Sequence, residues 1–579
     1  MCSPLRTGRS HSSCASTTRA AASAIVSNAR RAATFALKSA SPMKTVYEAF
    51  AATAIAAPDA AFLCAPPAPN RPYHPQGVEY TYGQAGAEVE RLRAAYEAAG
   101  FGHGHRVALL LENRPEFFFH YLALNALGSG IVPINPDYRR DEMLYQMEHS
   151  DADLAVVIAA RVTDVEVVAR ERAQPLPVVN AEDWPSTLPM PRVAPRGGTP
   201  GLDTECSLLY TSGTTGRPKG CVLTNRYYLT SGAWYRDIGG LVVIEQGRER
   251  ILNPLPLYHM NCQALTATCA MLTANCLILP ERFSPSRWWN DVVASRATII
   301  HYLGVMPPML LNQPVTPEER QHAVKFGVGA GVEPELHEAV EKRFGFPLIE
   351  AWGMTETGRV TLVNREPRMI HTRAFGRPFG GLEAKVADDT GGEVPRGTEG
   401  ELLVRWGGPE GPRHGFFSGY LKDEMATEEA WRGGWFHTGD VVRQDPDGML
   451  YFVDRKKNII RRAGENIAAA EIEAVIQAHD EVAQVAVVAA PDEVREEEVM
   501  ACIVAMPGVT ADAALADRIF EWCLERLAYF KAPGWMLFVP SLPTTGTQKV
   551  QKSQMFPKGE DPRRRHGAID LRERKRRRS

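Results

Sequence analysis

The sequence lacks the features of a membrane-spanning or disulfide-stabilised protein. No uninterrupted apolar run reaches the ~18 residues that a membrane span needs, and the closest stretch, 264–279, is broken by threonines and an asparagine. The ten cysteines form no CxxC pair, and we interpret Cys262, Cys269 and Cys276 as core residues rather than metal ligands or disulfide partners. The sequence therefore predicts a cytoplasmic protein without a transmembrane segment.

Acidic residues are scarce at both ends of the chain. Residues 1–42 hold six basic residues and no acid, and residues 563–579 hold nine Lys or Arg against two acids, which leaves the body with a net charge of −16. An acidic body argues against nucleic acid as the main partner. We interpret residues 1–42 as a disordered extension, either a start codon placed too early before Met43 or a targeting segment, and residues 557–579 as a basic disordered tail.

The order of predicted elements indicates an α/β fold. Helical and extended segments alternate, for example helix 84–98, strand 106–111, helix 116–127 and strand 131–134, which is typical of covered parallel or mixed sheets. Past residue 389, short strands joined by Gly, Pro and Asp turns predict a β-rich subdomain. After residue 457 a compact α/β pattern follows. We therefore predict a large N-terminal domain at 43–455 and a small mobile C-terminal domain at 456–556.

The most informative segment is 208–220, LLYTSGTTGRPKG, in which an apolar run ends in small polar residues and a lysine. Glycines let backbone N–H groups approach a phosphate, and hydroxyls and an ammonium add donors. The segment is not a Walker loop, because Lys219 is followed by Gly220. A plain polar surface loop is the alternative. The candidate phosphate-binding residues are Thr211, Ser212, Gly213, Thr214, Thr215, Gly216 and Lys219.

This segment resembles the phosphate-binding signature of the adenylate-forming, or AMP-binding, superfamily, which includes acyl-CoA synthetases, luciferases and peptide-synthetase adenylation domains. Five further segments match that family in order, so the resemblance covers roughly residues 45–555. It implies an ATP-dependent acyl-CoA synthetase, an acid–thiol ligase. Such an enzyme activates a carboxylic acid as acyl-AMP with release of pyrophosphate, and then transfers the acyl group to coenzyme A. ATP, Mg²⁺ and coenzyme A are the expected cofactor and co-substrates.

The resemblance assigns nucleotide-binding roles to three segments of the large domain. In AWGMTETG, 351–358, it implies that Trp352 stacks on adenine, Thr355 bonds the α-phosphate and Glu356 holds Mg²⁺, with Gly353 and Met354 beside them. A hard carboxylate suits Mg²⁺. In WFHTGD it implies that Asp440 takes the ribose hydroxyls, assisted by Arg455. The segment Gly329, Ala330 and Gly331 matches a stretch along adenine, although a glycine stands here where relatives carry proline.

Three further residues are assigned to the C-terminal half by the same resemblance. Lys457 occupies the hinge about which the small domain rotates, as an exposed polar residue can. Gly464, in RAGENI, borders the coenzyme A tunnel, and Ala463 replaces a glycine there. Lys549, in PTTGTQKV, is the catalytic lysine, whose ammonium can bridge the carboxylate and the α-phosphate.

The acid and the acceptor are less defined by the sequence. His259, in PLYHMNCQ, borders the acyl pocket by resemblance, and the local sequence is most similar to bacterial crotonobetaine/carnitine-CoA ligases. A quaternary ammonium would need aromatic faces or an acid. Other small acids stay open. An enzyme that loads a separate carrier protein and a non-catalytic nucleotide-binding protein are the alternatives, and a homodimer is left open.

Overall fold

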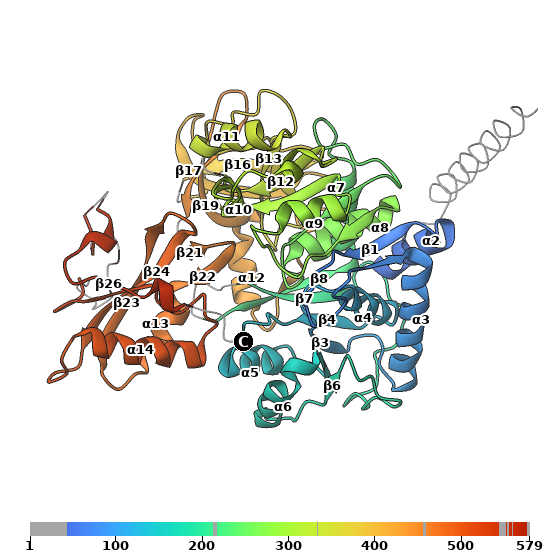
Figure 1. Cartoon of the computed structure of the whole chain (residues 1–579), viewed down its shortest axis with the longest axis horizontal. Helices are drawn as coiled ribbons and strands as arrows, with labels where there is room; N and C mark the ends of the chain where they lie inside the picture. The colour runs from blue at the N-terminus through green and yellow to red at the C-terminus, as the bar shows by residue number, and fades with distance from the viewer. Residues whose placement is uncertain are drawn as a thin grey trace, which may run out of the picture.

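The computed structural model describes residues 43–211, 217–332, 334–388, 390–455, 459–543, 550, 552, 555–557 and 560–575. Figure 1 shows a large body, coloured blue to orange, with a smaller red part at its left. Four sheets build the two parts, three in the large body and one in the smaller part. The α/β class and the mixed sheets predicted from the sequence are confirmed.

Two mostly parallel sheets form the centre of the large body. In the first, parallel strands run from β13 to β1 in the order β13-β12-β11-β9-β10-β1, with antiparallel β14 and β2 at the edges. Its strands are β1 (Ala61–Ala65), β2 (Val78–Thr81), β9 (Arg250–Leu252), β10 (Cys276–Ile278), β11 (Ile299–Leu303), β12 (Phe326–Ala330), β13 (Leu348–Gly353) and β14 (Val360–Leu362).

The second sheet has the order β18-β8-β7-β4-β3-β5-β6, and its strands from β7 to β6 are parallel. The antiparallel β7–β8 hairpin flanks the predicted phosphate loop, with Thr211 opposite Lys219. The strands are β3 (Arg106–Leu110), β4 (Gly130–Pro133), β5 (Leu154–Val157), β6 (Val178–Asn180), β7 (Glu205–Thr211), β8 (Lys219–Thr224) and β18 (Gly419–Tyr420).

Helices cover these sheets, and their ends follow the sequence. Helix α3 begins after Thr81, whose hydroxyl and the Gln84 side chain form a capping box, and α4 carries Pro115 at its first turn, where a missing N–H costs little. The helices of the large body are α2 (Val46–Ala56), α3 (Tyr82–Ala98), α4 (Pro115–Ala126), α5 (Arg140–His149), α6 (Val162–Glu171), α7 (Asn225–Arg236), α8 (Ala267–Thr273), α9 (Trp288–Ala294), α10 (Met306–Leu311), α11 (Pro334–Phe344) and α12 (Glu424–Ala430).

A third, antiparallel sheet forms the predicted β-rich subdomain, in the order β15-β20-β19-β17-β16. Its strands are β15 (Ala374–Gly376), β16 (Leu382–Ala387), β17 (Glu399–Trp406), β19 (Phe436–Gln444) and β20 (Leu450–Arg455). Strand β20 ends at Arg455, and the next strand, at Ile459, belongs to the fourth sheet. The change of sheet therefore falls at the boundary that the sequence predicts between the domains.

The C-terminal domain packs two helices on the fourth sheet. The long hairpin of β23 and β24 is its centre, and helices α13 and α14 share a buried apolar cluster with it. The elements are β21 (Ile459–Arg462), β22 (Glu465–Ala468), α13 (Ala469–Gln477), β23 (Val482–Asp492), β24 (Glu496–Ala505), α14 (Ala513–Arg526), β25 (Trp535–Phe538) and β26 (Ile569–Asp570).

The prediction of a disordered basic tail at 557–579 is wrong for residues 560–575. Strand β26 pairs antiparallel with β25, and Leu571 is buried in the core of the C-terminal domain. The basic side chains of this segment find acidic partners that are distant in the sequence, so charge alone did not indicate disorder. The predicted extension at 1–42 lies outside the described residues.

Two predictions about the core and the membrane can be compared with the described part of the chain. Cys262, Cys269 and Cys276 are buried free thiols, as core packing predicts. None of the described helices is long and apolar enough to cross a membrane.

Candidate active site

A cavity of about 380 Å³ lies where the carboxyl ends of β11, β12 and β13 meet the C-terminal domain. Ligands of α/β proteins commonly bind at this edge of a parallel sheet. The large body contributes Ala330, Gly331, Trp352, Gly353 and Asp440, all predicted nucleotide-site residues, and the small domain contributes Gly464. The other lining residues are Leu303, Gly304, Val332, Glu350, Ala351, Arg373, Ala374, Phe375, Phe452, Val453, Arg461, Glu465, Glu496 and Glu497.

Gly304 and Gly331 line this cavity, whereas the predicted residue Gly329 does not. At Gly304 and Gly329 another part of the chain approaches too closely for a side chain. A Cβ at Gly329 would lie 2.3 Å from the Tyr302 carbonyl oxygen, and one at Gly304 would lie 1.9 Å from the Gly331 oxygen. Gly331 has a φ of +87°. Proline fixes φ near −65°, so the glycine that departs from the resembled pattern is required by the backbone of this chain.

Trp352 and Asp440, which also line the cavity, are hydrogen-bonded to each other. The Trp352 indole N–H donates to Oδ2 of Asp440 over 2.8 Å, and the two residues are only 7% and 1% exposed. A guanidinium nitrogen of Arg461 lies 3.9 Å from the other carboxylate oxygen. The backbone of Arg455 pairs with that of Asp440, although the Arg455 side chain is outside what the structure describes. The three sequence segments predicted to hold adenine and ribose are thus brought together.

The residues around the phosphate loop form a second polar group. The Tyr420 hydroxyl donates to Oε1 of Glu356 over 2.9 Å, and the Lys219 ammonium lies 4.7 Å from the centre of the Tyr420 ring. Burial and the Glu356 carboxylate hold the pKa of Tyr420 well above its usual value, so its hydroxyl stays a donor. The backbone oxygen of Thr355 accepts from the Tyr227 hydroxyl over 2.7 Å. The two motifs that carry Lys219 and Glu356 therefore converge.

His259 faces the small domain. Its Nε2 lies 3.6 Å from a carboxylate oxygen of Glu465, and the neighbouring Tyr258 hydroxyl donates to the same carboxylate over 3.2 Å. Burial alone would raise the pKa of Glu465, but the neighbouring His259 and the hydrogen bond from Tyr258 bring it below the usual value, so the group is an anion. His259 is not among the residues that line the cavity, although Glu465 is.

Gly464 touches the large body directly. It has a φ of +87°, and a Cβ there would lie 2.2 Å from Cδ1 of Leu303. A side chain would therefore push the two domains apart. Ala463, which replaces a glycine of the resembled motif, has a φ of +50°, a conformation that costs a non-glycine residue about 1 kcal/mol or more.

A buried ion pair also joins the two domains. The Lys531 ammonium lies 2.8 Å from Glu142 of α5 and 2.8 Å from Glu471 of α13, and it sits 4.8 Å from the centre of the Tyr138 ring. Burial raises the pKa of the Glu142 carboxyl to about 7, against the pull of Lys531 and with the help of Glu471. Two carboxylates thus share one ammonium in a region from which water is largely excluded.

Some predicted residues lie outside the described part of the chain, namely Ser212, Gly213, Thr214, Thr215, Gly216, Lys457 and Lys549. Sequence reasoning missed Tyr420, Glu350, Arg461 and Glu465. Glu350 and Glu465 adjoin or belong to recognised motifs, so their positions carried a signal. Tyr420 had none, since it reaches Glu356 from 64 residues away.

Comparison with known proteins finds two family models along the chain. The AMP-binding enzyme family matches residues 50–421, and the AMP-binding enzyme C-terminal domain matches residues 471–549. The crotonobetaine/carnitine–CoA ligase of Proteus mirabilis is 30% identical over 492 residues, which are 82% of this chain and 93% of that protein.

Two solved structures of one enzyme resemble this chain to different degrees. The o-succinylbenzoate CoA synthetase of Bacillus subtilis, as a double mutant bound with its product analogue, gives a TM-score of 0.75 at 25% identity, over 88% of this chain and 98% of that one. The same enzyme in complex with its acyl-adenylate intermediate gives 0.60 at 25% identity over the same shares, 88% and 98%. With both family models matched, and with Trp352, Asp440 and Gly464 at one cavity, the chain belongs to the family of AMP-binding enzymes.

Proposed function

We propose that this protein activates a small carboxylic acid that carries a quaternary ammonium and transfers it to coenzyme A. The enzyme is an ATP-dependent acyl-CoA synthetase, an acid–thiol ligase that works through an acyl-adenylate. The observation that carries the proposal is the cavity in which Trp352 and Asp440 of the large domain face Gly464 of the small domain. A nucleotide site that borders the small domain suits an adenylate that a thiol must reach.

The described residues fit the roles expected for the nucleotide. The Asp440 carboxylate can accept hydrogen bonds from ribose hydroxyls, and it lies beside the Trp352 indole. Glu356 is a buried carboxylate that accepts from Tyr420. Among the described residues no group of three or more His, Cys, Asp or Glu could hold a metal alone. Mg²⁺ commonly binds one or two carboxylates together with substrate phosphates, so Glu356 would hold it there and the ion would neutralise phosphate charge.

The orientation of the C-terminal domain supports the thioester-forming step. Glu465 contacts His259 and Tyr258, and Gly464 packs against Leu303. The greater similarity to the relative bound with its product analogue than to the acyl-adenylate complex of the same enzyme agrees with that assignment. In the first half-reaction we propose that the domain rotates about Lys457 and brings Lys549 to the α-phosphate, where its ammonium lowers the repulsion between the two anions.

The acid is inferred from the relatives and from charge. Relatives that are 30% identical over 82% of this chain are named crotonobetaine/carnitine–CoA ligases. Carboxylates and aromatic rings are the groups that a quaternary ammonium needs, and the Glu465 carboxylate and the Tyr258 ring lie together beside His259. These residues supply a recognition surface for such an acid.

The test is CoA-dependent AMP release with matched acids. Crotonobetaine, carnitine and γ-butyrobetaine should be turned over faster than crotonate, 3-hydroxybutyrate and butyrate, which lack the charge. Equal rates with charged and uncharged acids would overturn the assignment of the acid. AMP release without coenzyme A, stimulated by a carrier protein instead, would favour the carrier-loading alternative. Cytoplasmic location and a homodimer stay predictions, which cell fractionation and sedimentation would test.

A further inference from the structure

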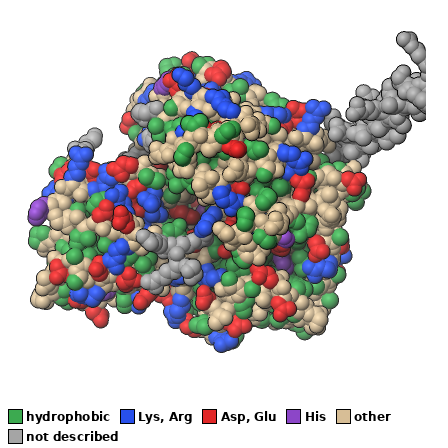
Figure 2. Space-filling view, in the orientation of Figure 1, with side chains coloured by type: hydrophobic (Ala, Val, Ile, Leu, Met, Phe, Trp, Pro, Cys, Tyr) green, Lys and Arg blue, Asp and Glu red, His purple; other side chains and the backbone are tan. Residues whose placement is uncertain are grey.

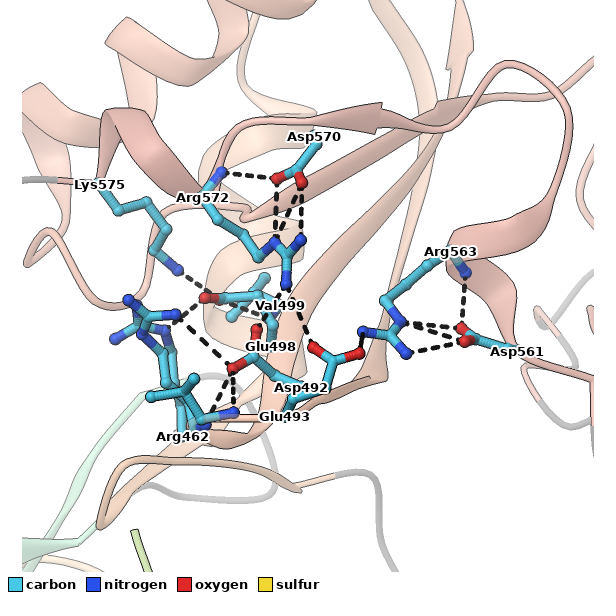
Figure 3. A network of polar contacts seen from close by, with 12 residues as sticks. Arg462, Asp492, Glu493, Glu498, Val499, Asp561, Arg563, Asp570, Arg572 and Lys575 are labelled. Carbon is cyan, nitrogen blue, oxygen red and sulfur yellow. Dashed lines mark hydrogen bonds and ion pairs between the residues drawn. The ribbon is translucent and has the colours of Figure 1, made fainter. Parts of the chain in front are cut away.

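The basic segment 560–575 lies against the C-terminal domain as a strap. Its strand β26 pairs with β25, and the Leu571 N–H donates to the Gly534 oxygen over 2.8 Å. The Leu571 side chain is 3% exposed within the domain core. Figure 3 shows the polar contacts that this strap makes with the strands beneath it.

Basic residues of the strap bind acids of the β23–β24 hairpin. A guanidinium nitrogen of Arg572 lies 3.0 Å from Asp492, and one of Arg563 lies 2.6 Å from Glu493. Burial alone would raise the pKa of Asp492, but Arg572 and two backbone N–H groups lower it below the usual value. The strap therefore binds the turn at Asp492 and Glu493. This turn leads to Glu496 and Glu497, both of which line the active-site cavity.

The innermost contact continues toward the cavity. Glu498 is completely buried, and its two oxygens face different partners: Lys575 of the strap donates to Oε1, and Arg462 donates to Oε2 over 2.7 Å. Lys575 also donates to the Phe530 backbone oxygen over 3.0 Å. Arg462 is followed by Ala463 and Gly464, the loop that packs on the large domain. One carboxylate thus connects the end of the chain to the cavity wall.

The loop itself depends on this anchoring. The Ala463 N–H donates to the Arg495 oxygen over 3.1 Å, and the Arg461 N–H donates to a carboxylate oxygen of Glu497 over 2.6 Å. Ala463 has a positive φ, a conformation that surrounding contacts must maintain in a residue other than glycine. A shift of Arg462 would move the Gly464 backbone relative to Leu303.

We propose that the strap, residues 560–575, positions the Arg461–Glu465 hairpin for the thioester-forming step through the chain of contacts Lys575, Glu498 and Arg462. Glu498 and Lys575 are positioning residues, because neither lines the cavity. This inference rests on the proposed transfer to coenzyme A. It assigns a role in the second half-reaction to a segment that the sequence indicated to be disordered.

The charges of the three groups make the contact testable. Two cations share one buried carboxylate, and burial together with the Arg462 guanidinium lowers the pKa of Lys575 to about 7. Glu498→Gln removes the anion that both cations share, so Lys575 either stays charged beside Arg462, which is unfavourable in a buried site, or loses its proton, and both results weaken the contact. Adding Lys575→Met removes one of those cations. The double variant should therefore recover part of what Glu498→Gln loses.

The experiment measures the two half-reactions separately in the full chain, with the acid that reacts fastest in the panel above. Glu498→Gln should slow acyl transfer to coenzyme A about tenfold, which corresponds to about 1.4 kcal/mol, while ATP–pyrophosphate exchange stays within about twofold. Lys575→Met should have a smaller effect in the same direction. Deletion of residues 576–579 is the matched control, because it removes three arginines but leaves the strap.

The two rates and the melting temperature distinguish a positioning role of the strap from a role in stability alone. Selective loss of acyl transfer with partial recovery in the double variant supports the strap. Equal loss in both half-reactions with a lower melting temperature overturns it, since the strap would then serve stability alone. Parental rates in both single variants, or the same loss in the 576–579 deletion, also overturn it. If the parental enzyme itself forms no coenzyme A ester, the proposed function fails before the strap is tested.

Discussion

Removal of the Lys531 ammonium should impair the second half-reaction far more than the first. Lys531 is the buried cation between Glu142 of the large domain and Glu471 of its own domain, with side chains 6%, 6% and 12% exposed. The contact with Glu142 exists only while the domains hold this orientation. Lys531→Met removes the counterion that Glu142 and Glu471 share and leaves their buried oxygens without their donor, and the domains can relieve that cost by separating.

The size of the effect follows from the burial of the pair. Removing one partner of a buried ion pair costs about 3–5 kcal/mol. Part of that cost falls within the C-terminal domain, because Glu471 belongs to it. When about 2 kcal/mol of the cost acts on the contact between the domains, the equilibrium shifts about 30-fold away from the orientation in which Lys531 contacts Glu142. We expect acyl transfer to coenzyme A to slow by a similar factor when that orientation is rate-limiting.

The assay compares ATP–pyrophosphate exchange with acyl transfer from preformed acyl-AMP. Exchange should stay within about twofold, since the first half-reaction uses the other orientation. Limited proteolysis near residue 457 should become faster as the domains separate. The double variant Lys531→Met/Glu142→Gln is the control, because it removes the uncompensated charge and should recover part of the transfer rate. Equal slowing of both half-reactions, or no change in transfer, would refute the role of this pair.

Three further predictions concern the same two orientations. In the orientation of this structure, in which Lys531 contacts Glu142 and which we call docked, the pKa of Glu142 is raised to about 7. When the domains separate, Glu142 is exposed and its pKa returns to the usual value near 4.5. The docked orientation therefore binds the proton more tightly, and its stability relative to the separated domains should fall as pH rises from about 4.5 to 7. The transfer rate of Glu142→Gln should lose that part of its pH dependence, and a profile identical to the parent would contradict the assignment. Lys549→Ala should slow adenylate formation ~10²-fold or more and spare transfer from supplied acyl-AMP, whereas equal losses would show that the lysine serves both steps. Lys457→Pro fixes φ at the hinge, so ATP–pyrophosphate exchange should persist while formation of the coenzyme A ester collapses. Lys457→Ala, which leaves the backbone free, is the control. A proline variant that forms the ester at the parental rate would exclude rotation about this residue.

The regular elements could be predicted from the sequence because their signals are local. Helix α3 forms where the helix at 84–98 is predicted, and its apolar residues at helical spacing, Ala85, Val89, Leu92 and Tyr96, are all buried. The parallel strands around residues 106 and 131 also appear where short apolar runs indicate them. The order of the motifs was enough to predict that Trp352, Asp440 and Gly464 lie near one another, because each motif has a fixed place in the family fold. The three residues do line one cavity.

The contacts that the sequence did not predict join distant positions. Lys531 and Glu142 are 389 residues apart, and Lys575 and Glu498 are 77 apart. Neither pair is marked by spacing, since the sequence around a lysine does not distinguish a solvated side chain from a buried one. The disordered-tail prediction failed for this reason: composition describes the segment by itself, whereas its order comes from acids on β23 and β24.

The chemistry of the interdomain contact suits an enzyme that must change its orientation in every cycle. A large apolar interface would hold the two domains together through a non-directional gain from burial. A buried ion pair instead contributes little net free energy compared with apolar side chains of similar volume, yet it is specific in geometry. The Glu142–Lys531–Glu471 contact can therefore define the docked orientation without making it permanent. On the face shown in Figure 2, acidic and basic side chains are intermixed over both domains.

The strap contacts lie wholly within the C-terminal domain, so they can maintain the conformation of the hairpin that carries Gly464 while that domain moves as a unit.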